Sequence, residues 1–296
     1  MTLRCLSGIL TSLSALALVS APLQASADEF IGFGQAGVPG GWALEAFPVF
    51  QHTSPNSNTI YSSFNPAYFT ETGFTGTHRD QFEFWLNGSV GYSNTHGAPG
   101  GSGFGGAYPN LGIEYYYNVL VPDQPPGSPG YKTFWTSPTF TIAFPNGSSK
   151  TAGFGAGANQ YSFGFNVNNY LQIGRWGITF NPIELNYATR NLNETAIADG
   201  QMVKFKGGLS ATFMDVAGGY QVRDDLFLGL HHAYSIYSWK GSDFPEMREG
   251  KIGPSFTYFG FAKYGLYVSG NVNFDYYTSS NLKKSVSVTM AIVKNL

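Results

Sequence analysis

Strict alternation of apolar and polar side chains recurs along almost the whole chain and limits what it can fold into. Between Tyr264 and Tyr276, the side chains expected to point one way are Tyr264, Leu266, Val268, Val272, Phe274 and Tyr276, and those expected to point the other way are Gly265, Ser269, Asn271, Asn273 and Asp275. Successive side chains of a strand point to opposite sides, so this segment predicts a strand with one apolar and one polar face. A soluble sheet over a core and an outer-membrane barrel both produce that pattern. In a barrel the apolar side chains face lipid and the polar ones face the lumen.

Composition separates these two architectures. Only 11% of the residues are charged and 17% are aromatic, whereas soluble domains average about 25% charged residues. A soluble protein of this composition would expose large apolar patches. A barrel needs it, because its exterior faces lipid and its rims carry aromatic girdles. The formal net charge of −2 argues against a nucleic-acid partner, for which a basic surface is expected.

The N-terminal residues 1–27 have the features of a secretory signal peptide. Arg4 supplies a basic start, residues 9–19 are an apolar run, and Ala25-Ser26-Ala27 is a small-residue cleavage site. The run is too short to span a hydrocarbon core about 30 Å thick. The single cysteine, Cys5, lies in this segment, so residues 28–296 form neither a disulfide nor a cysteine-ligated zinc site. We therefore expect a signal peptide over 1–27 and an outer-membrane β-barrel over 28–296.

The alternation predicts an all-β fold, a transmembrane antiparallel up-and-down β-barrel of about 12 strands. The expected strands are 42–50, 58–70, 80–93, 109–120, 133–144, 159–171, 176–187, 202–222, 226–239, 250–261, 265–277 and 284–294. Short connections alternate with longer ones, as periplasmic turns alternate with outer loops, which places both termini in the periplasm. The long, proline-rich connection 121–132 is the exception on the inner side. Two strands need a bulge to keep their phase, one near Phe213 and Met214 and one at Pro182.

Several short elements resemble the bacterial outer-membrane family named for the meta-pathway of phenol degradation, whose members are often called transporters. In chain order they are Phe144-Pro145-Asn146-Gly147, the 190–195 loop with Gly200, the strand, turn and restart at 219–230, and the Gly253-Pro254 strand opening. The resemblance implies a monomer-sized barrel, placed by the outer-membrane insertion machinery and related in role to channels for hydrophobic compounds. One departure is the last residue, Leu296, where many outer-membrane proteins have an aromatic residue.

Strand phase also predicts which polar side chains line the lumen. The inward set is Glu83, Glu114, Asn166, Asn168, Glu184, Lys204, Lys206, Asp215, His231, Asn271, Asn273 and Asp275. Two interpretations remain open. These side chains either fill the barrel as a paired network, because charges in a dry interior must pair, or line a path whose walls select solutes. Glu184 is the expected partner of the two lysines, with Asp215 further along their strand.

Three apolar residues in expected outer loops, Phe154, Phe244 and Met247, are candidates for solute capture. The glycine-rich segment 101–106 has the spacing of a dinucleotide-binding loop, but no helix follows it, so we expect an outer loop. His231 and His232 are adjacent and face opposite sides of a strand, so they cannot jointly bind a metal. We expect no catalytic residues, no metal and no other cofactor.

The leading hypothesis is a channel of the bacterial outer membrane for passive uptake of small hydrophobic or aromatic compounds. Its partners would be outer-membrane lipid and the solute. The alternative is a non-conducting structural or surface-interaction barrel. A third interpretation, an outer-membrane hydrolase, lacks a serine and histidine of defined spacing. Conductance and solute uptake distinguish the first two hypotheses.

Overall fold

The computed structural model describes residues 30, 38–53, 57–95, 103–145, 159–190, 195–198, 201–204, 206–238, 246–279 and 282–296. The expected signal peptide, residues 1–27, lies outside the described residues, as do two of the expected capture residues, Phe154 and Phe244. Within the described ranges, no helix is long and apolar enough to cross a membrane.

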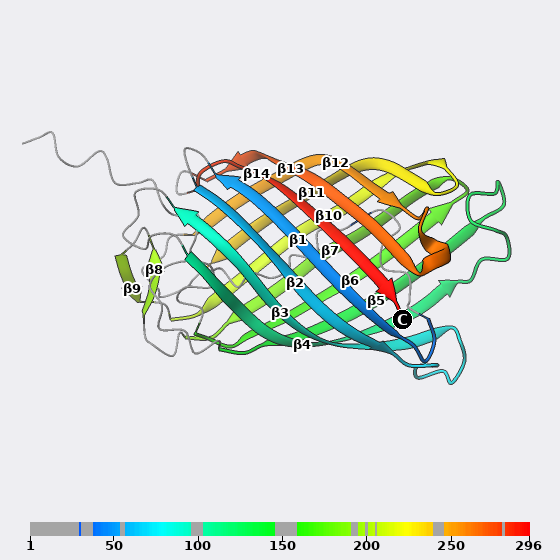
Figure 1. Ribbon diagram of the computed structural model, residues 1–296, viewed down its shortest axis with the longest axis horizontal. Helices are drawn as coiled ribbons and strands as arrows, with labels where there is room; N and C mark the ends of the chain where they lie inside the picture. Colours follow the sequence, from blue (N-terminus) through cyan, green and yellow to red (C-terminus); the bar gives the residue numbers. More distant parts are fainter. Residues whose placement is uncertain are drawn as a thin grey trace, which may run out of the picture.

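Twelve antiparallel strands close into a barrel (Figure 1). They are β1 (Trp42–Thr53), β2 (Ser57–Phe69), β3 (Asp80–Thr95), β4 (Gly103–Leu120), β5 (Lys132–Ala143), β6 (Ser162–Ile173), β7 (Trp176–Ala188), β10 (Gly208–Arg223), β11 (Leu226–Ser238), β12 (Met247–Tyr258), β13 (Leu266–Thr278) and β14 (Ser285–Asn295). Each barrel strand pairs with the barrel strands that precede and follow it in the chain, with β7 next to β10, and β1 pairs with β14 to close the wall. The expected up-and-down barrel of 12 strands is confirmed.

The expected strand 202–222 is wrong at its start. Residues 195–204 contain β8 (Thr195–Ala198) and β9 (Gln201–Lys204), which pair with each other in a separate two-stranded sheet. Barrel strand β10 begins only at Gly208. The alternation that suggested one long strand is a local signal, which a short hairpin in a connection shares with a membrane-spanning strand. The expected outer loop at 101–106 is also partly wrong, because β4 already includes Gly103 to Gly106.

In this barrel the large apolar side chains face outward and many polar side chains are buried inside, which is the opposite of the arrangement in a soluble protein. The exposed large hydrophobic residues lie on alternate positions of the strands and include Leu86, Phe140 and Leu230. The positions between them face inward and are mostly buried serine, threonine, asparagine, glutamine and acidic residues. An apolar exterior suits lipid, and aromatic pairs such as Trp42–Tyr68 and Trp176–Tyr220 lie at one rim, where girdles are expected. The chain is therefore an outer-membrane β-barrel.

Both expected bulges are present. The pairing of β10 with β11 shifts between Phe213 and Val216, and Met214 has a φ of 50°. The pairing of β6 with β7 shifts opposite Pro182, between Asn166 and Asn169. Each bulge inserts a residue and restores the inward phase of the polar side chains that follow it.

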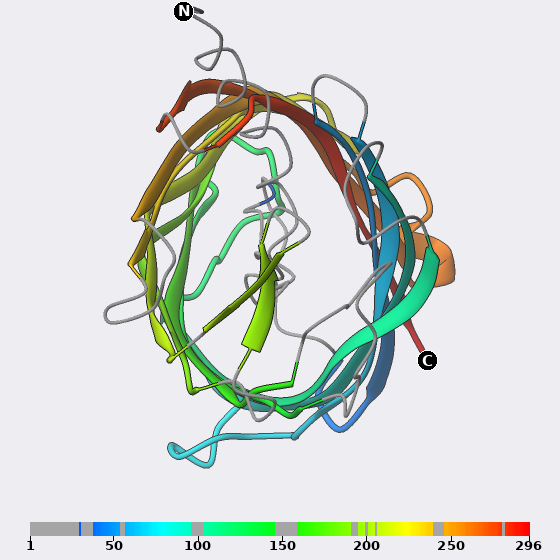
Figure 2. The same ribbon diagram turned by 90° about the vertical axis from the view of Figure 1, so that its left-hand side faces the viewer.

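The two ends of the barrel differ. One end, called here the terminal end, carries the start of β1, the end of β14 and the connections 70–79, 121–131, 174–175, 224–225 and 259–265. The opposite end, called the loop end, carries the β8–β9 hairpin and faces the viewer in Figure 2, where the strands form a single ring. At the terminal end the connection 259–265 contains a short 3-10 helix, η2 (Ala262–Tyr264). Tyr131 lies in the connection 121–131, and its burial raises the pKa of its hydroxyl above the usual value.

Candidate functional site: the barrel lumen

Most of the residues expected to line the lumen do face it. Eight of them are almost fully buried on the inner face, namely Glu83, Glu114, Glu184, Asp215, His231, Asn271, Asn273 and Asp275. Asn166 and Asn168 are partly buried, and the side-chain oxygen of each is buried. The structure thus places the acids, the amides and the histidine of this set on the inner face of the wall.

Three expected positions need correction. Lys204 lies in β9 and Lys206 in the link after it, where it is exposed, so neither stands on the barrel strand that was expected to carry both. Met247 does not lie in an outer loop. It is the first residue of β12 and is buried, which removes it as an exposed capture residue. The β12 strand begins earlier than expected because residues 247–249 pair with β11.

Near the terminal end, three glutamates gather on one wall. Glu83 and Glu114 are directly opposite each other on β3 and β4, and Glu45 of β1 is close enough to repel both. Like charges in such a register destabilise a sheet. Each carboxylate accepts a hydrogen bond: Glu83 from the Tyr116 hydroxyl at 2.9 Å, Glu114 from Ser137, and Glu45 from the Asn65 amide at 3.4 Å.

Next to these acids lies an aromatic cluster, defined as Phe69, Tyr116, Trp135 and Tyr170. All four side chains are buried inside the barrel. Their ring centroids follow one another at 6.4, 5.7 and 5.9 Å, within the range of favourable aromatic contacts. The indole nitrogen of Trp135 has no hydrogen-bond partner. The cluster gives the lumen an apolar surface at the same end as its acids.

Halfway along the barrel a polar belt crosses neighbouring strands. His231 of β11 lies between Asp215 of β10, at 2.6 Å from Nε2 to Oδ1, and Asn273 of β13, at 2.7 Å from Nδ1 to Oδ1. Strand β12 separates β11 from β13, and Gly253 is the β12 residue opposite His231. Gly253 carries no side chain to obstruct the ring. A Cβ there would also lie 1.6 Å from the Val272 carbonyl oxygen.

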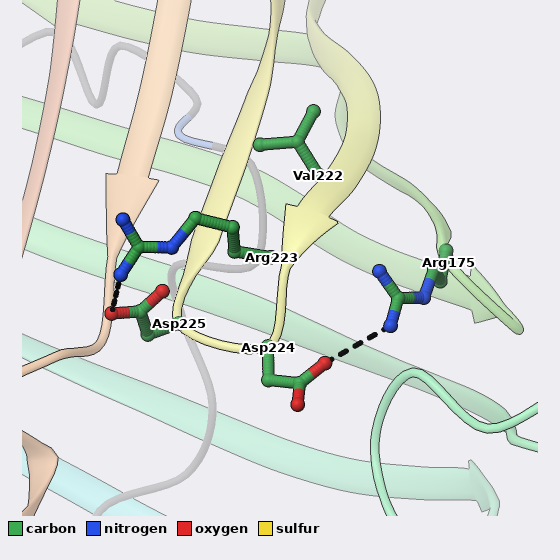
Figure 3. A pocket seen from close by; sticks show the side chains of 5 residues that line it. All are labelled: Arg175, Val222, Arg223, Asp224 and Asp225. Carbon is green, nitrogen blue, oxygen red and sulfur yellow. Dashed lines mark hydrogen bonds and ion pairs between the residues drawn. The ribbon is translucent and has the colours of Figure 1, made fainter.

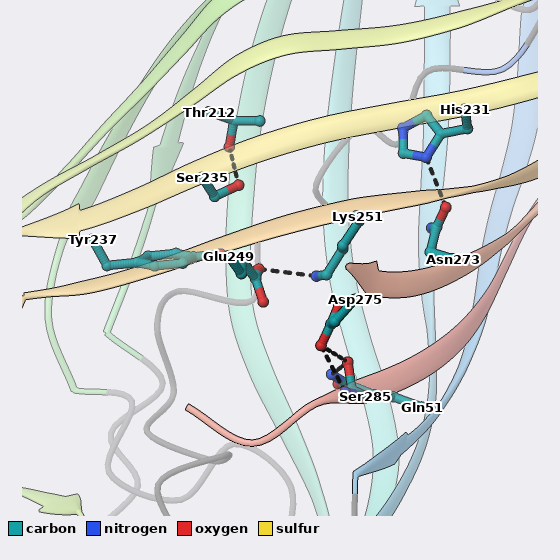
Figure 4. Close-up of polar contacts among 10 residues, drawn as sticks. All are labelled: Gln51, Thr212, His231, Ser235, Tyr237, Glu249, Lys251, Asn273, Asp275 and Ser285. Carbon is teal, nitrogen blue, oxygen red and sulfur yellow. Dashed lines mark hydrogen bonds and ion pairs between the residues drawn. The ribbon is translucent and has the colours of Figure 1, made fainter. Parts of the chain in front are cut away.

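Toward the loop end the lumen holds a charged network (Figure 4). Lys251 Nζ donates to Glu249 Oε1 at 2.9 Å, and the Tyr237 hydroxyl donates to the same oxygen at 2.8 Å. Asp275 accepts hydrogen bonds from the backbone nitrogen and the hydroxyl of Ser285. Lys251 also attracts Asp275, so its ammonium group interacts favourably with the carboxylates of both Glu249 and Asp275.

Sequence reasoning missed three charged members of these groups: Glu45, Glu249 and Lys251. Lys251 occupies the same set of alternate positions on β12 as Gly253, Ser255 and Thr257. Because that set is small or polar, the alternation could have identified Lys251 as facing inward. Glu249 was missed because the expected strand began one residue after it. Glu45 shares its inward face with Phe47 and Val49, so polarity alone does not mark that face.

A further pocket lies on the terminal rim, outside the lumen (Figure 3). It is lined by Arg175, Val222, Arg223, Asp224 and Asp225. Its charges pair across the turns, Arg175 with Asp224 at 3.0 Å and Arg223 with Asp225 at 2.9 Å. Exposed pairs of this kind contribute roughly 0–1 kcal/mol. Within the described residues, no group of histidine, cysteine and acidic side chains could hold a metal ion.

Comparison with known proteins supports the fold. No family model matches the sequence, and no curated protein matches it. A solved outer membrane channel from Pseudomonas putida F1 superposes with a TM-score of 0.67 at 11% identity, covering 89% of this chain and 98% of that one. The CymD monoaromatic hydrocarbon channel gives a TM-score of 0.47 at 7% identity, over 88% of this chain and 89% of that one. The NanC porin gives 0.44 at 12% identity, over 86% and 100%.

Proposed function

We propose that this chain is a channel of the bacterial outer membrane through which small hydrophobic or aromatic compounds cross by passive diffusion. The terminal end would face the periplasm, and residues 1–27 would be removed as a signal peptide before the insertion machinery places the barrel. Lumenal side chains would form the path, and Phe154 and Phe244 would capture solute at the outer side. The resemblance to the phenol-degradation family supports the same role.

The aromatic cluster inside the lumen is the observation that carries this proposal. A lumen built only for water-soluble solutes is lined by polar groups, whereas Phe69, Tyr116, Trp135 and Tyr170 bury their rings on the inner face. Aromatic contacts between a solute and such rings contribute about 0.5–1.5 kcal/mol each beyond the area they bury.

Uptake of toluene into vesicles tests the proposal, with lipopolysaccharide in the outer leaflet to slow unassisted crossing. The Trp135→Ala variant should lower the rate of uptake about 2- to 10-fold, since it removes one aromatic contact. Trp42→Ala is the matched control, because Trp42 lies at the same end but is exposed on the outer face. Equal rates with and without the protein would exclude the channel.

The alternative, a non-conducting structural barrel, rests on a different observation. The charged groups of the loop-end network and of the polar belt bind one another, as expected of a lumen filled by its own side chains. Planar-bilayer recordings separate the two functions. Absence of single-channel conductance at high protein density, together with absence of uptake, would favour the structural barrel. A hydrolase finds less support, because both ring nitrogens of His231 already contact Asp215 and Asn273.

A further inference from the structure

On the outer wall of the barrel, toward the loop end, three tyrosine rings gather around one glycine. Gly250 of β12 is opposite Tyr234 of β11 on one side and opposite Tyr277 of β13 on the other. The rings of Tyr234 and Tyr277 stack across it, with their centroids 6.2 Å apart and 30° between their planes. A Cβ at residue 250 would lie 2.4 Å from Cζ of Tyr276, so the glycine leaves the space in which these rings lie along the wall.

A β-bulge puts two of these tyrosines on the outer face. The pairing of β12 with β13 shifts directly after Gly250, so that β13 carries one extra residue at Tyr276. Consecutive strand residues normally face opposite sides, and a bulge changes the direction of the extra side chain. Tyr276 and Tyr277 are accordingly both exposed, by 50% and 43%. The Tyr276 hydroxyl lies 3.0 Å from Nε2 of His232, which gives this polar group a partner on a wall that faces lipid.

Two cations border the tyrosines on the side of the loop end. Arg248, two residues before the glycine on β12, is 48% exposed, and the Tyr234 side chain is within hydrogen-bonding reach of its guanidinium. Lys284 directly precedes β14 and is exposed, and the register of β13 with β14, continued by two residues, brings it opposite Tyr276. The name tyrosine patch is used here for Tyr234, Arg248, Tyr276, Tyr277 and Lys284.

Between the patch and the middle of the membrane, the outer wall is apolar. The nearest outward side chains on β12, β13 and β14 are Ile252, Phe274 and Val286, and all three are exposed. Tyrosine rings at the edge of an apolar band, with cations beyond them, are typical of a membrane interface. The wall therefore offers an apolar surface for acyl chains and, next to it, positive charge for phosphate.

We infer that the tyrosine patch binds lipopolysaccharide, with the acyl chains along the apolar wall and the phosphate groups at Arg248 and Lys284. The assignment to the outer leaflet rests on the proposed orientation, in which the terminal end faces the periplasm. Because the two cations are two strands apart, about 10 Å separates them across the sheet. That spacing suits a lipid whose disaccharide carries two phosphate groups better than a phospholipid with one.

The acidic side chains of this part of the wall leave the patch accessible to phosphate. Strands β11 to β14 carry two acids, Glu249 and Asp275, and both belong to the charged network of the lumen. Glu246, just before β12, pairs with Arg248 at 2.6 Å, and both side chains are about half exposed. Exposed pairs of this kind contribute little to stability, whereas arginine and phosphate form two parallel charge-assisted hydrogen bonds. Phosphate should therefore displace Glu246 from Arg248.

Titration of the folded barrel in dodecyl maltoside with deep-rough lipopolysaccharide tests the inference, with EDTA present so that divalent cations form no bridges. Binding raises the temperature at which the folded band disappears on a gel. Arg248→Gln combined with Lys284→Gln should raise the half-maximal concentration about 25-fold, because each cation beside an anionic lipid contributes about fivefold. Lys263→Gln combined with Lys294→Gln is the matched control. It removes two exposed lysines at the terminal end and should leave that concentration unchanged.

Two single variants give graded and opposite changes. Lys284→Gln alone should raise the half-maximal concentration about fivefold. Glu246→Gln should lower it by up to about fivefold, because it frees Arg248 from its exposed partner. All of these substitutions alter exposed side chains, so the barrel should still fold, and the folded band on the gel reports this directly.

The inference is overturned if lipopolysaccharide does not stabilise the wild type, or if removing its phosphate groups or substituting phosphatidylglycerol leaves the effect unchanged. It is also overturned if the two double variants respond alike, or if Glu246→Gln weakens binding. No solute crosses a membrane in this assay. Failure here therefore leaves the proposed channel standing, and failure of toluene uptake leaves the lipid site standing.

Discussion

Replacing Val272 by arginine gives the sharpest test of which face of the barrel meets lipid. Val272 lies at the middle of β13, where alternate residues from Ser269 to Asp275 are buried inside and the residues between them face outward. An arginine there would place a charge in the hydrocarbon region. The matched variant is Val268→Arg, on the same strand and the same face but closer to the terminal rim.

The expected magnitudes follow from the strand. A residue of a strand tilted by about 40° rises roughly 2.5 Å along the barrel axis. Val272 is the central residue of the 13 in β13, so it lies near the midplane. Val268, four residues away, lies about 10 Å from the midplane, close to the edge of an apolar band about 25 Å tall. Arginine should lower the free energy of unfolding by about 2–4 kcal/mol when it replaces Val272 and by about 0–1 kcal/mol when it replaces Val268.

Reversible denaturant unfolding in lipid vesicles measures both free energies. A difference near 2 kcal/mol corresponds to roughly 30-fold in the folding equilibrium constant, well above the error of the method. Ser269→Arg, on the inner face of the same strand, controls for the volume of the new side chain. Equal losses of stability at residues 268 and 272 would refute the placement of β13 in the membrane, and a larger loss at Ser269 than at Val272 would refute the inward and outward assignment.

Three further results are expected. Lys251→Met should destabilise the barrel by about 1–3 kcal/mol, between the values for exposed and fully buried pairs, because the Lys251 and Glu249 side chains are 23% and 15% exposed; the double variant with Glu249→Gln should regain most of that loss in the same unfolding assay. Phe30 is buried and its carbonyl oxygen accepts a 2.8 Å hydrogen bond from Thr179 on the inner face of β7, so Phe30→Ala should raise single-channel conductance; unchanged conductance would place Phe30 away from the conducting path. Amino-terminal sequencing of the purified mature protein should begin at Asp28, and the protein should fractionate with the outer membrane and migrate heat-modifiably; recovery in the soluble periplasm would contradict this.

The sequence was sufficient to predict the fold because a membrane barrel repeats one local rule on every strand. The inner and outer faces of β13, and the bulges at Met214 and Pro182, follow from alternation and from where it breaks. The same rule fails at residues 201–206. Val203 and Lys204 alternate as a membrane strand would, yet their partners are in β8, and pairing is a property of distant segments that local alternation does not encode.

The chemistry of the lumen was only partly predictable for a related reason. Phase places Asp215, His231 and Asn273 on the inner face, but the contact between them depends on the register of three strand pairs. It also depends on a glycine at 253 that leaves the ring unobstructed. The absence of hydrogen-bond partners for the buried side-chain amide of Asn181 likewise depends on which neighbours do not reach it. No pattern along the chain contains that information.

Closure of the wall by β1 and β14 has a consequence for the order in which this protein can form. The two strands that seal the ring are the first and the last of the barrel to be synthesised, so the outer edge of β1 has no partner until the eleven residues of β14 have been made. Contacts between such distant segments make folding slow, and unpaired edges invite aggregation. A nascent chain of this design depends on being held unfolded until it is complete, and a nonsense mutation within β14 would leave two open edges in place of a barrel.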